Sequence, residues 1–130
     1  MTPVKKMTRS NLEAELNTAS PLRVIQLLFE GLMARMMEAR GAIEHEDFFK
    51  KAECLSSAIA IITELKRSLD PSAAPALGAN LGALYGYCLE GLLEVNKTNN
   101  TEKLDEVASL IRTVKEGFDG IQDPEDQNER

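Results

Sequence analysis

The stretch "LGANLGALYGYCLEGLLEVN" (residues 77–96) contains two signals that conflict. Its apolar residues recur every three or four positions, which is the spacing of one face of an α-helix; they are Leu77, Leu81, Leu84, Cys88, Leu92 and Val95. Glycine nevertheless stands at positions 78, 82, 86 and 91, and each glycine inside a helix costs about 1 kcal/mol relative to alanine. We therefore predict a helix in which glycine has a role other than helix stability.

Three of these glycines share one side of the predicted helix. Gly78, Gly82 and Gly86 are spaced four residues apart, so they stack along the helix and form a strip without side chains. Such a strip lets another backbone approach closely. Two interpretations remain open: the strip packs against a helix of the same domain, or it lines a groove that admits a helix or extended segment of another protein.

Three further helical patterns surround this one. Ser20 and Pro21 have the residue types of a helix N-cap and first helical position, and the apolar pattern that follows is broad enough to meet more than one neighbour. Asp47 is the predicted cap of a second helix and Asn100 that of the last, while "DPSAAP" (residues 70–75) separates the second from the third. The predicted stripe of the second helix is Phe48, Ala52, Leu55, Ile59, Ile62 and Leu69, and that of the last is Leu104, Val107, Ile111, Val114, Phe118 and Ile121.

These patterns predict an all-α fold. No segment alternates with period two over a useful length, so strands are not expected. Four helices with short connections favour an antiparallel four-helix bundle over residues 18–121. Residues 1–17 are expected to form a loosely held basic arm, and residues 122–130 a disordered acidic tail.

Composition excludes several classes of function. The net charge of −6 argues against a nucleic-acid-binding surface, which needs clustered Lys and Arg. No apolar run has the length of a membrane span, and the N-terminus lacks the apolar stretch of a signal peptide. We therefore expect a cytoplasmic protein without membrane insertion. Cys54 and Cys88 lie in apolar helical contexts and are predicted to be reduced core or groove residues, with a disulfide or metal pair as the alternative.

Catalytic chemistry is not apparent in the sequence. His45 is the single histidine; a di-iron bundle needs Glu-x-x-His pairs, and the residue three before His45 is Ala42. A phosphotransfer bundle would carry its histidine in mid-helix, whereas His45 falls in a predicted turn, so this class is kept as an alternative to be tested. A phosphate-binding Gly-Lys-Ser/Thr loop is absent. We predict a protein that is not an enzyme and has no cofactor or metal.

The chain resembles a known family in three long segments. "LNTASPLRVIQLLFEGLMARMMEARGAIE" (residues 16–44), "KAECLSSAIAIITELKRSLD" (51–70) and "NLGALYGYCLEGLLEVNKTNNTEKLDEVASLIRTVKEGFDGI" (80–121) are similar to the flagellin-specific export chaperones, the FliS family. Within them, "NLGALYGY" resembles the family's Asn-Leu-x-x-Leu-Tyr-x-Tyr signature. The three glycines of the strip stand at positions that are not a family feature.

The resemblance implies a chaperone that binds the C-terminal segment of flagellin, prevents premature polymerisation and aids delivery to the flagellar type III export apparatus. The alternative is a helical interaction or regulatory protein of the flagellar system with a partner other than flagellin. A monomer or weak homodimer is expected. The predicted partner-binding groove comprises Gly78, Leu81, Gly82, Leu84, Tyr85, Tyr87, Cys88, Ile61 and Leu65.

Overall fold

The computed structural model describes residues 20–70 and 75–121 of the chain. Within these residues it contains four α-helices, namely α2 (Pro21–Glu44), α3 (Phe48–Arg67), α4 (Pro75–Thr98) and α5 (Thr101–Asp119). The predicted arm (residues 1–17) and the predicted tail (residues 122–130) lie outside the described residues, and both remain predictions.

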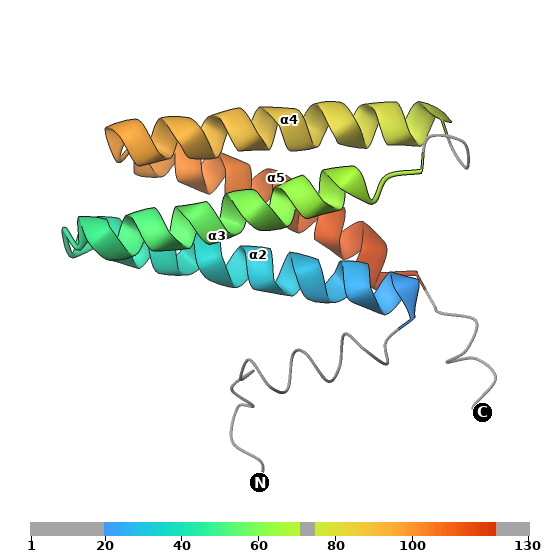
Figure 1. The fold of residues 1–130 in the computed structure, drawn as a ribbon, viewed down its shortest axis with the longest axis horizontal. Helices are drawn as coiled ribbons and strands as arrows, with labels where there is room; N and C mark the ends of the chain where they lie inside the picture. Colours follow the sequence, from blue (N-terminus) through green and yellow to red (C-terminus); the bar gives the residue numbers. More distant parts are fainter. Residues whose placement is uncertain (1–19, 71–74, 122–130) are drawn as a thin grey trace, which may run out of the picture.

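The helices form a ring around one core. Consecutive helices run in opposite directions (Figure 1), and each packs against two others: α2 and α4 both contact α3 and α5. The predicted antiparallel four-helix bundle is therefore confirmed. This up-and-down order brings the start of α2, the end of α3, the start of α4 and the end of α5 to the same end of the bundle (Figure 1).

Three helices begin directly after the residues predicted to cap them. The side chain of Ser20 accepts a hydrogen bond from the Arg23 amide at 3.2 Å. Asp47 accepts from the Lys50 amide at 3.1 Å, and Asn100 accepts from the Lys103 amide at 3.2 Å. Each bond satisfies one of the free amides in a helix's first turn.

The core is apolar, and its largest fully buried side chains are Tyr85, Phe29, Leu32, Met36, Leu55, Ile62, Leu65, Leu92, Leu104, Ile111, Val95 and Val107. Cys54 and Cys88 are buried as well, and both thiols are free. None of the helices in residues 20–70 and 75–121 is long and apolar enough to cross a bilayer.

The predicted stripe of α3 is wrong at its start. Phe48 and Ala52 are exposed, whereas Lys51 is buried. Lys51 Nζ donates to Asn96 O at 2.9 Å and to Asn99 Oδ1 at 2.6 Å. This side of α3 packs against the end of α4, whose last carbonyls need hydrogen-bond donors. A lysine therefore occupies the buried position at the start of α3, although the apolar pattern predicted Phe48 and Ala52 there.

The end of the last helix also differs from the predicted stripe. α5 stops at Asp119, and Ile121 is 52% exposed beyond it. Gly120 follows the last helical residue and donates its amide to Glu116 O at 3.1 Å, which closes the helix. The apolar spacing therefore continues two residues past the helix without making core contacts there.

Candidate functional site

An open cavity lies at the end of the bundle where α2 and α4 begin and α3 and α5 end. Its volume is about 200 Å³, and we call it the end cavity. All four helices contribute to its lining, which consists of Ile25, Leu65, Ser68, Leu69, Asp70, Leu77, Gly78, Leu81, Tyr85 and Phe118. Most of these side chains are apolar, so the end cavity suits apolar groups rather than charged ones.

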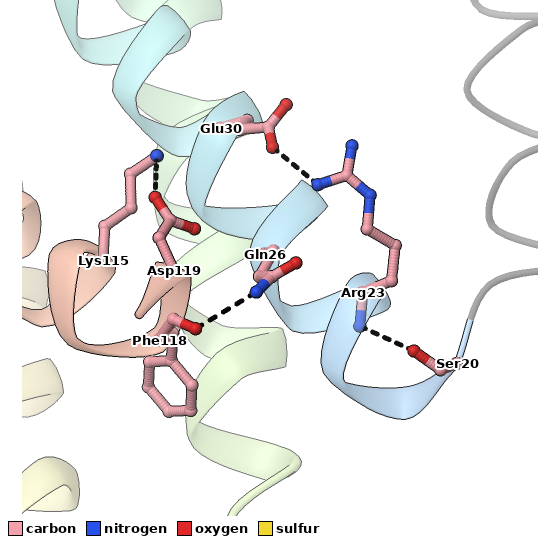
Figure 2. A network of polar contacts seen from close by, with 7 residues as sticks. All are labelled: Ser20, Arg23, Gln26, Glu30, Lys115, Phe118 and Asp119. Carbon is pink, nitrogen blue, oxygen red and sulfur yellow. Dashed lines mark hydrogen bonds and ion pairs between the residues drawn. The ribbon is translucent and has the colours of Figure 1, made fainter. Parts of the chain in front are cut away.

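One wall of the end cavity is fixed by a hydrogen bond between α2 and α5. Gln26 Nε2 donates to Phe118 O at 3.1 Å (Figure 2). This carbonyl belongs to the last turn of α5 and also accepts from the Ile121 amide, just beyond the helix, at 3.1 Å. The Phe118 ring also packs on Phe29, with 5.4 Å between ring centroids. Gln26 therefore holds the last turn of α5 against α2 and places Phe118 at the cavity.

Ion pairs on the surface surround this contact. Arg23 pairs with Glu30 at 3.0 Å, and Lys115 pairs with Asp119 one turn along α5 (Figure 2). The carboxylates of both pairs are well exposed to solvent. Exposed pairs of this kind contribute about 0–1 kcal/mol each, so the apolar contacts and the Gln26 bond determine the shape of this wall.

The facing wall is the first half of α4, where the glycine strip lies. A Cβ atom on Gly82 would meet Leu69 Cδ1 at 3.8 Å, and one on Gly86 would meet Lys66 Nζ at 3.9 Å. These are ordinary contacts with the ends of side chains. Gly78 itself lines the end cavity. The strip therefore faces the end of α3 without the close helix-to-helix approach that the first interpretation requires.

The fourth glycine of α4 behaves differently. A Cβ atom on Gly91 would lie 2.7 Å from Val107 Cγ2 and 3.4 Å from Lys103 Cε, and Gly91 is buried. Only glycine fits at this position without movement of α5. Close packing in α4 thus occurs at Gly91, outside the strip.

The nine residues predicted to bind a partner fall into several places. Gly78, Leu81, Tyr85 and Leu65 line the end cavity. Gly82 lies beside it, opposite Leu69. Leu84 is half-buried against the core, and Cys88 is fully buried within it. Whether these residues contact a partner remains a prediction.

Ile61 and Tyr87 lie away from the end cavity. Ile61 lines a separate depression of about 280 Å³ between α2 and α3, together with Leu27, Glu30, Gly31, Ala34, Arg35 and Ser57. Tyr87 is 40% exposed and faces α5. The structure thus does not unite the nine residues in one groove.

Tyr87 belongs to a polar cluster that joins α4 to α5. Its hydroxyl donates to Glu106 Oε2 at 2.9 Å and accepts from Lys103 Nζ at 2.7 Å. Lys103 Nζ also lies 4.5 Å from the centre of the Tyr87 ring. The hydrogen bond that Lys103 donates to Tyr87 raises the pKa of Lys103, and the one that Lys103 donates to Glu106 lowers the pKa of Glu106. The cluster therefore joins α4 to α5, and both Lys103 and Glu106 stay charged in it.

Several lining residues were not predicted from the sequence. Leu69 and Phe118 belong to the predicted apolar stripes, Ile25 belongs to the broad apolar pattern that follows Pro21, and Leu77 belongs to the apolar face of its helix without a predicted role in binding. Leu77 is 57% exposed in the structure. Its position two residues after "DPSAAP" is the available signal, because the first turn of a helix that follows a linker has fewer neighbours to cover it.

Burial raises the pKa of Tyr85 to about 12, so its phenol stays neutral at the cavity. His45 lies in the turn after α2, with Nδ1 2.8 Å from Gly41 O. In the part of the chain that the structure describes, no group of three or more His, Cys, Asp or Glu side chains is arranged to hold a metal ion.

Comparisons with known proteins identify the family and the fold of the chain. The family model "Flagellar protein FliS" matches residues 4–125. The chain is 40% identical over 121 residues to the flagellar secretion chaperone FliSB of Pseudomonas aeruginosa, covering 93% of this chain and 96% of that protein. It is 33% identical over 119 residues to the flagellar secretion chaperone FliS of Salmonella typhimurium, covering 91% and 88%. A solved structure of a bacterial flagellar chaperone shares the fold, with a TM-score of 0.72, 18% identity and coverage of 88% and 89%.

Proposed function

Because the chain belongs to the FliS family of flagellar secretion chaperones, we propose that it binds the C-terminal segment of newly made flagellin in the cytoplasm. Binding prevents the segment from polymerising prematurely, and the chaperone helps to deliver it to the flagellar type III export apparatus. Since the relatives are chaperones, the prediction that the chain is not an enzyme is confirmed. The client and its delivery go beyond that assignment and need their own test.

The observation that carries this proposal is the end cavity. A segment that cannot fold alone gains free energy when it inserts apolar side chains into a groove on a folded partner. Ordering such a segment costs about 2–5 kcal/mol, so useful affinity requires several buried apolar anchors. Leu77 and Leu81 of α4 and Phe118 of α5 offer apolar surface of this kind on two walls of the opening.

The depression between α2 and α3 is a second place for an anchor. Leu27, Ala34 and Ile61 form an apolar floor, and Gly31 lets a side chain approach the backbone of α2. Glu30 and Arg35 stand at its margin. An amphipathic segment that crosses α2 would place one anchor in each cavity, which is the helix-in-groove mode of recognition.

Calorimetry with a flagellin C-terminal peptide tests the proposal. We expect micromolar or tighter binding, and we expect Leu77→Asp to weaken it at least tenfold, because a carboxylate would then lie in the apolar opening. Leu93→Asp is the matched control: Leu93 also lies on α4, is 56% exposed compared with 57% for Leu77, and does not line the end cavity.

Two results would contradict parts of the proposed function. Absence of binding at micromolar peptide would favour the alternative, a flagellar interaction protein whose client is not flagellin. Equal loss of binding in Leu77→Asp and Leu93→Asp would remove the end cavity as the site. A His45→Ala variant that keeps binding, together with no phosphate uptake from a donor, would exclude the phosphotransfer class.

A further inference from the structure

The polar contacts of α4 with other helices are confined to one half of the helix. Within residues 75–98, the side chains and carbonyls that hydrogen-bond to another helix begin at Tyr87, which contacts Lys103 and Glu106 of α5. Asn96 O accepts from Lys51 of α3 further along. The first half, which the structure describes from Ala76 to Gly86, is held to its neighbours by apolar contacts.

Among Gly82, Gly86 and Gly91, the tightest packing is at Gly91, in the same second half. Gly91 is the position where a Cβ atom would come within 2.7 Å of Val107 on α5. At Gly82 and Gly86 the corresponding distances are 3.8 and 3.9 Å, and the atoms met are the mobile ends of the Leu69 and Lys66 side chains. The second half is thus packed tightly on α5 at Gly91, whereas the first half meets Lys66 and Leu69, at and just after the end of α3, at ordinary distances.

Glycine also makes the first half the less rigid part of the helix. Gly78, Gly82 and Gly86 all fall in it, and each gives the helical state a larger entropic cost than alanine would. The same half supplies Leu77, Gly78, Leu81 and Tyr85 to the end cavity. The weakly held half of α4 is therefore also one wall of the cavity.

The opposite wall is fixed. Gln26 of α2 holds Phe118 of α5 by the hydrogen bond to its carbonyl at 3.1 Å, and Phe118 packs on the buried Phe29. A cavity with one fixed wall and one weakly held wall can change its width when Leu77, Gly78 and Leu81, which are exposed or half-buried, slide past their neighbours. Tyr85 is fully buried and lies next to Gly86, so it stays in the core in this movement.

We propose that the first half of α4, residues 76–86, is an adjustable wall of the end cavity, which moves away from the end of α3 about Gly86 when a client segment enters. This inference rests on the proposed function for the identity of the client. The glycine strip then serves to lower the cost of widening the cavity, which answers why a helix contains three glycines at this spacing.

Amide hydrogen exchange on the free protein tests the wall without a client. We expect the amides of residues 81–86 to exchange at least about tenfold faster than those of residues 92–97, since local opening precedes global unfolding. The variant Gly82→Ala/Gly86→Ala should reduce this ratio about tenfold, because alanine favours the helix at both positions and neither methyl group would clash. Equal exchange in the two halves of wild-type α4 would overturn the proposal.

Stopped-flow binding of the flagellin C-terminal peptide tests the consequence. The double variant should associate about tenfold more slowly than wild type with an unchanged dissociation rate, since fewer molecules have the widened cavity. Gly41→Ala in α2 is the control, because a Cβ atom there meets nothing within 4 Å, and its association rate should equal that of wild type.

The outcomes separate the two proposals. Unchanged association of the double variant, or an effect confined to faster dissociation, would overturn the adjustable wall and indicate that the methyl groups only remove contacts with the client. If the peptide fails to bind wild-type protein, the proposed client is wrong, and the exchange ratio still decides whether the wall exists.

Discussion

Gly91 of α4 and Val107 of α5 are the closest-packed pair between these two helices at a glycine, since a Cβ atom on Gly91 would lie 2.7 Å from Val107 Cγ2. The Val107 side chain is fully buried and cannot move aside into solvent. One glycine of α4 is therefore required by packing, while Gly82 and Gly86 have ordinary distances to their neighbours.

Gly91→Ala is expected to destabilise the bundle despite the higher helix propensity of alanine. The added methyl group gains up to about 1 kcal/mol in propensity, but overpacking a core costs about 1–3 kcal/mol. Urea denaturation should show a net loss of stability, with Gly41→Ala as the control that gains stability. A Gly91→Ala variant more stable than wild type would show that α5 yields easily at Val107.

Gly82→Leu is expected to block client binding with little change in melting temperature. The Cβ position is open except for Leu69 Cδ1 at 3.8 Å, so a leucine side chain can project beside the end cavity while improving helix propensity. Calorimetry with the flagellin peptide and thermal unfolding by circular dichroism measure the two effects. A sharp fall in melting temperature would instead place the strip in an interface within the bundle.

The fold could be predicted from the sequence because its signals are local. The caps Ser20, Asp47 and Asn100 bond to amides three residues ahead, and apolar spacing identifies each helix without knowledge of its neighbours. The burial of Lys51 could not be predicted in this way, because it depends on Asn96 and Asn99, which lie far along the chain and come close only in the folded bundle.

The candidate site was less predictable for the same reason. Leu81 and Tyr85, two residues of the predicted groove, both line the end cavity, but the cavity also needs Ile25 of α2, Phe118 of α5 and Leu69 just after α3. Whether an apolar residue fills the core or lines an opening depends on how far the helix ends diverge. Helical periodicity contains no information on the distance between helix ends. Cys88, which lies in the core, and Leu81, which lines the cavity, therefore occupy equivalent positions in the apolar pattern.

Lys51→Met is expected to lower the free energy of unfolding by about 1–3 kcal/mol. The methionine would keep most of the side-chain volume but would leave Asn96 O and Asn99 Oδ1 without the donor that Lys51 Nζ provides. Lys50→Met is the matched control, because Lys50 is adjacent and exposed. Urea denaturation measures both variants, and equal stability of the two would show that the buried ammonium contributes nothing net.

The buried thiol of Cys88 predicts a loss of stability at alkaline pH. Burial, followed by the nearby charge of Glu106, raises the pKa of Cys88 to about 11 from the ordinary value of 9.0. A group whose pKa is raised on folding contributes stability below its unfolded pKa, and that contribution is lost as pH rises through the folded pKa. Between pH 8.5 and 10 the free energy of unfolding should therefore fall by about 1 kcal/mol from this thiol.

Urea denaturation of wild type and Cys88→Ala over this range provides the measurement. Cys88→Ala will be less stable at every pH because it leaves a cavity in the core, so the informative quantity is the slope of stability against pH rather than its value. The slope should be shallower in the variant. Part of it should remain, because burial also raises the pKa of Cys54, and removing both thiols should flatten it further. An unchanged slope in Cys88→Ala would mean that this thiol ionises as readily in the folded chain as in the unfolded one, which is incompatible with its complete burial.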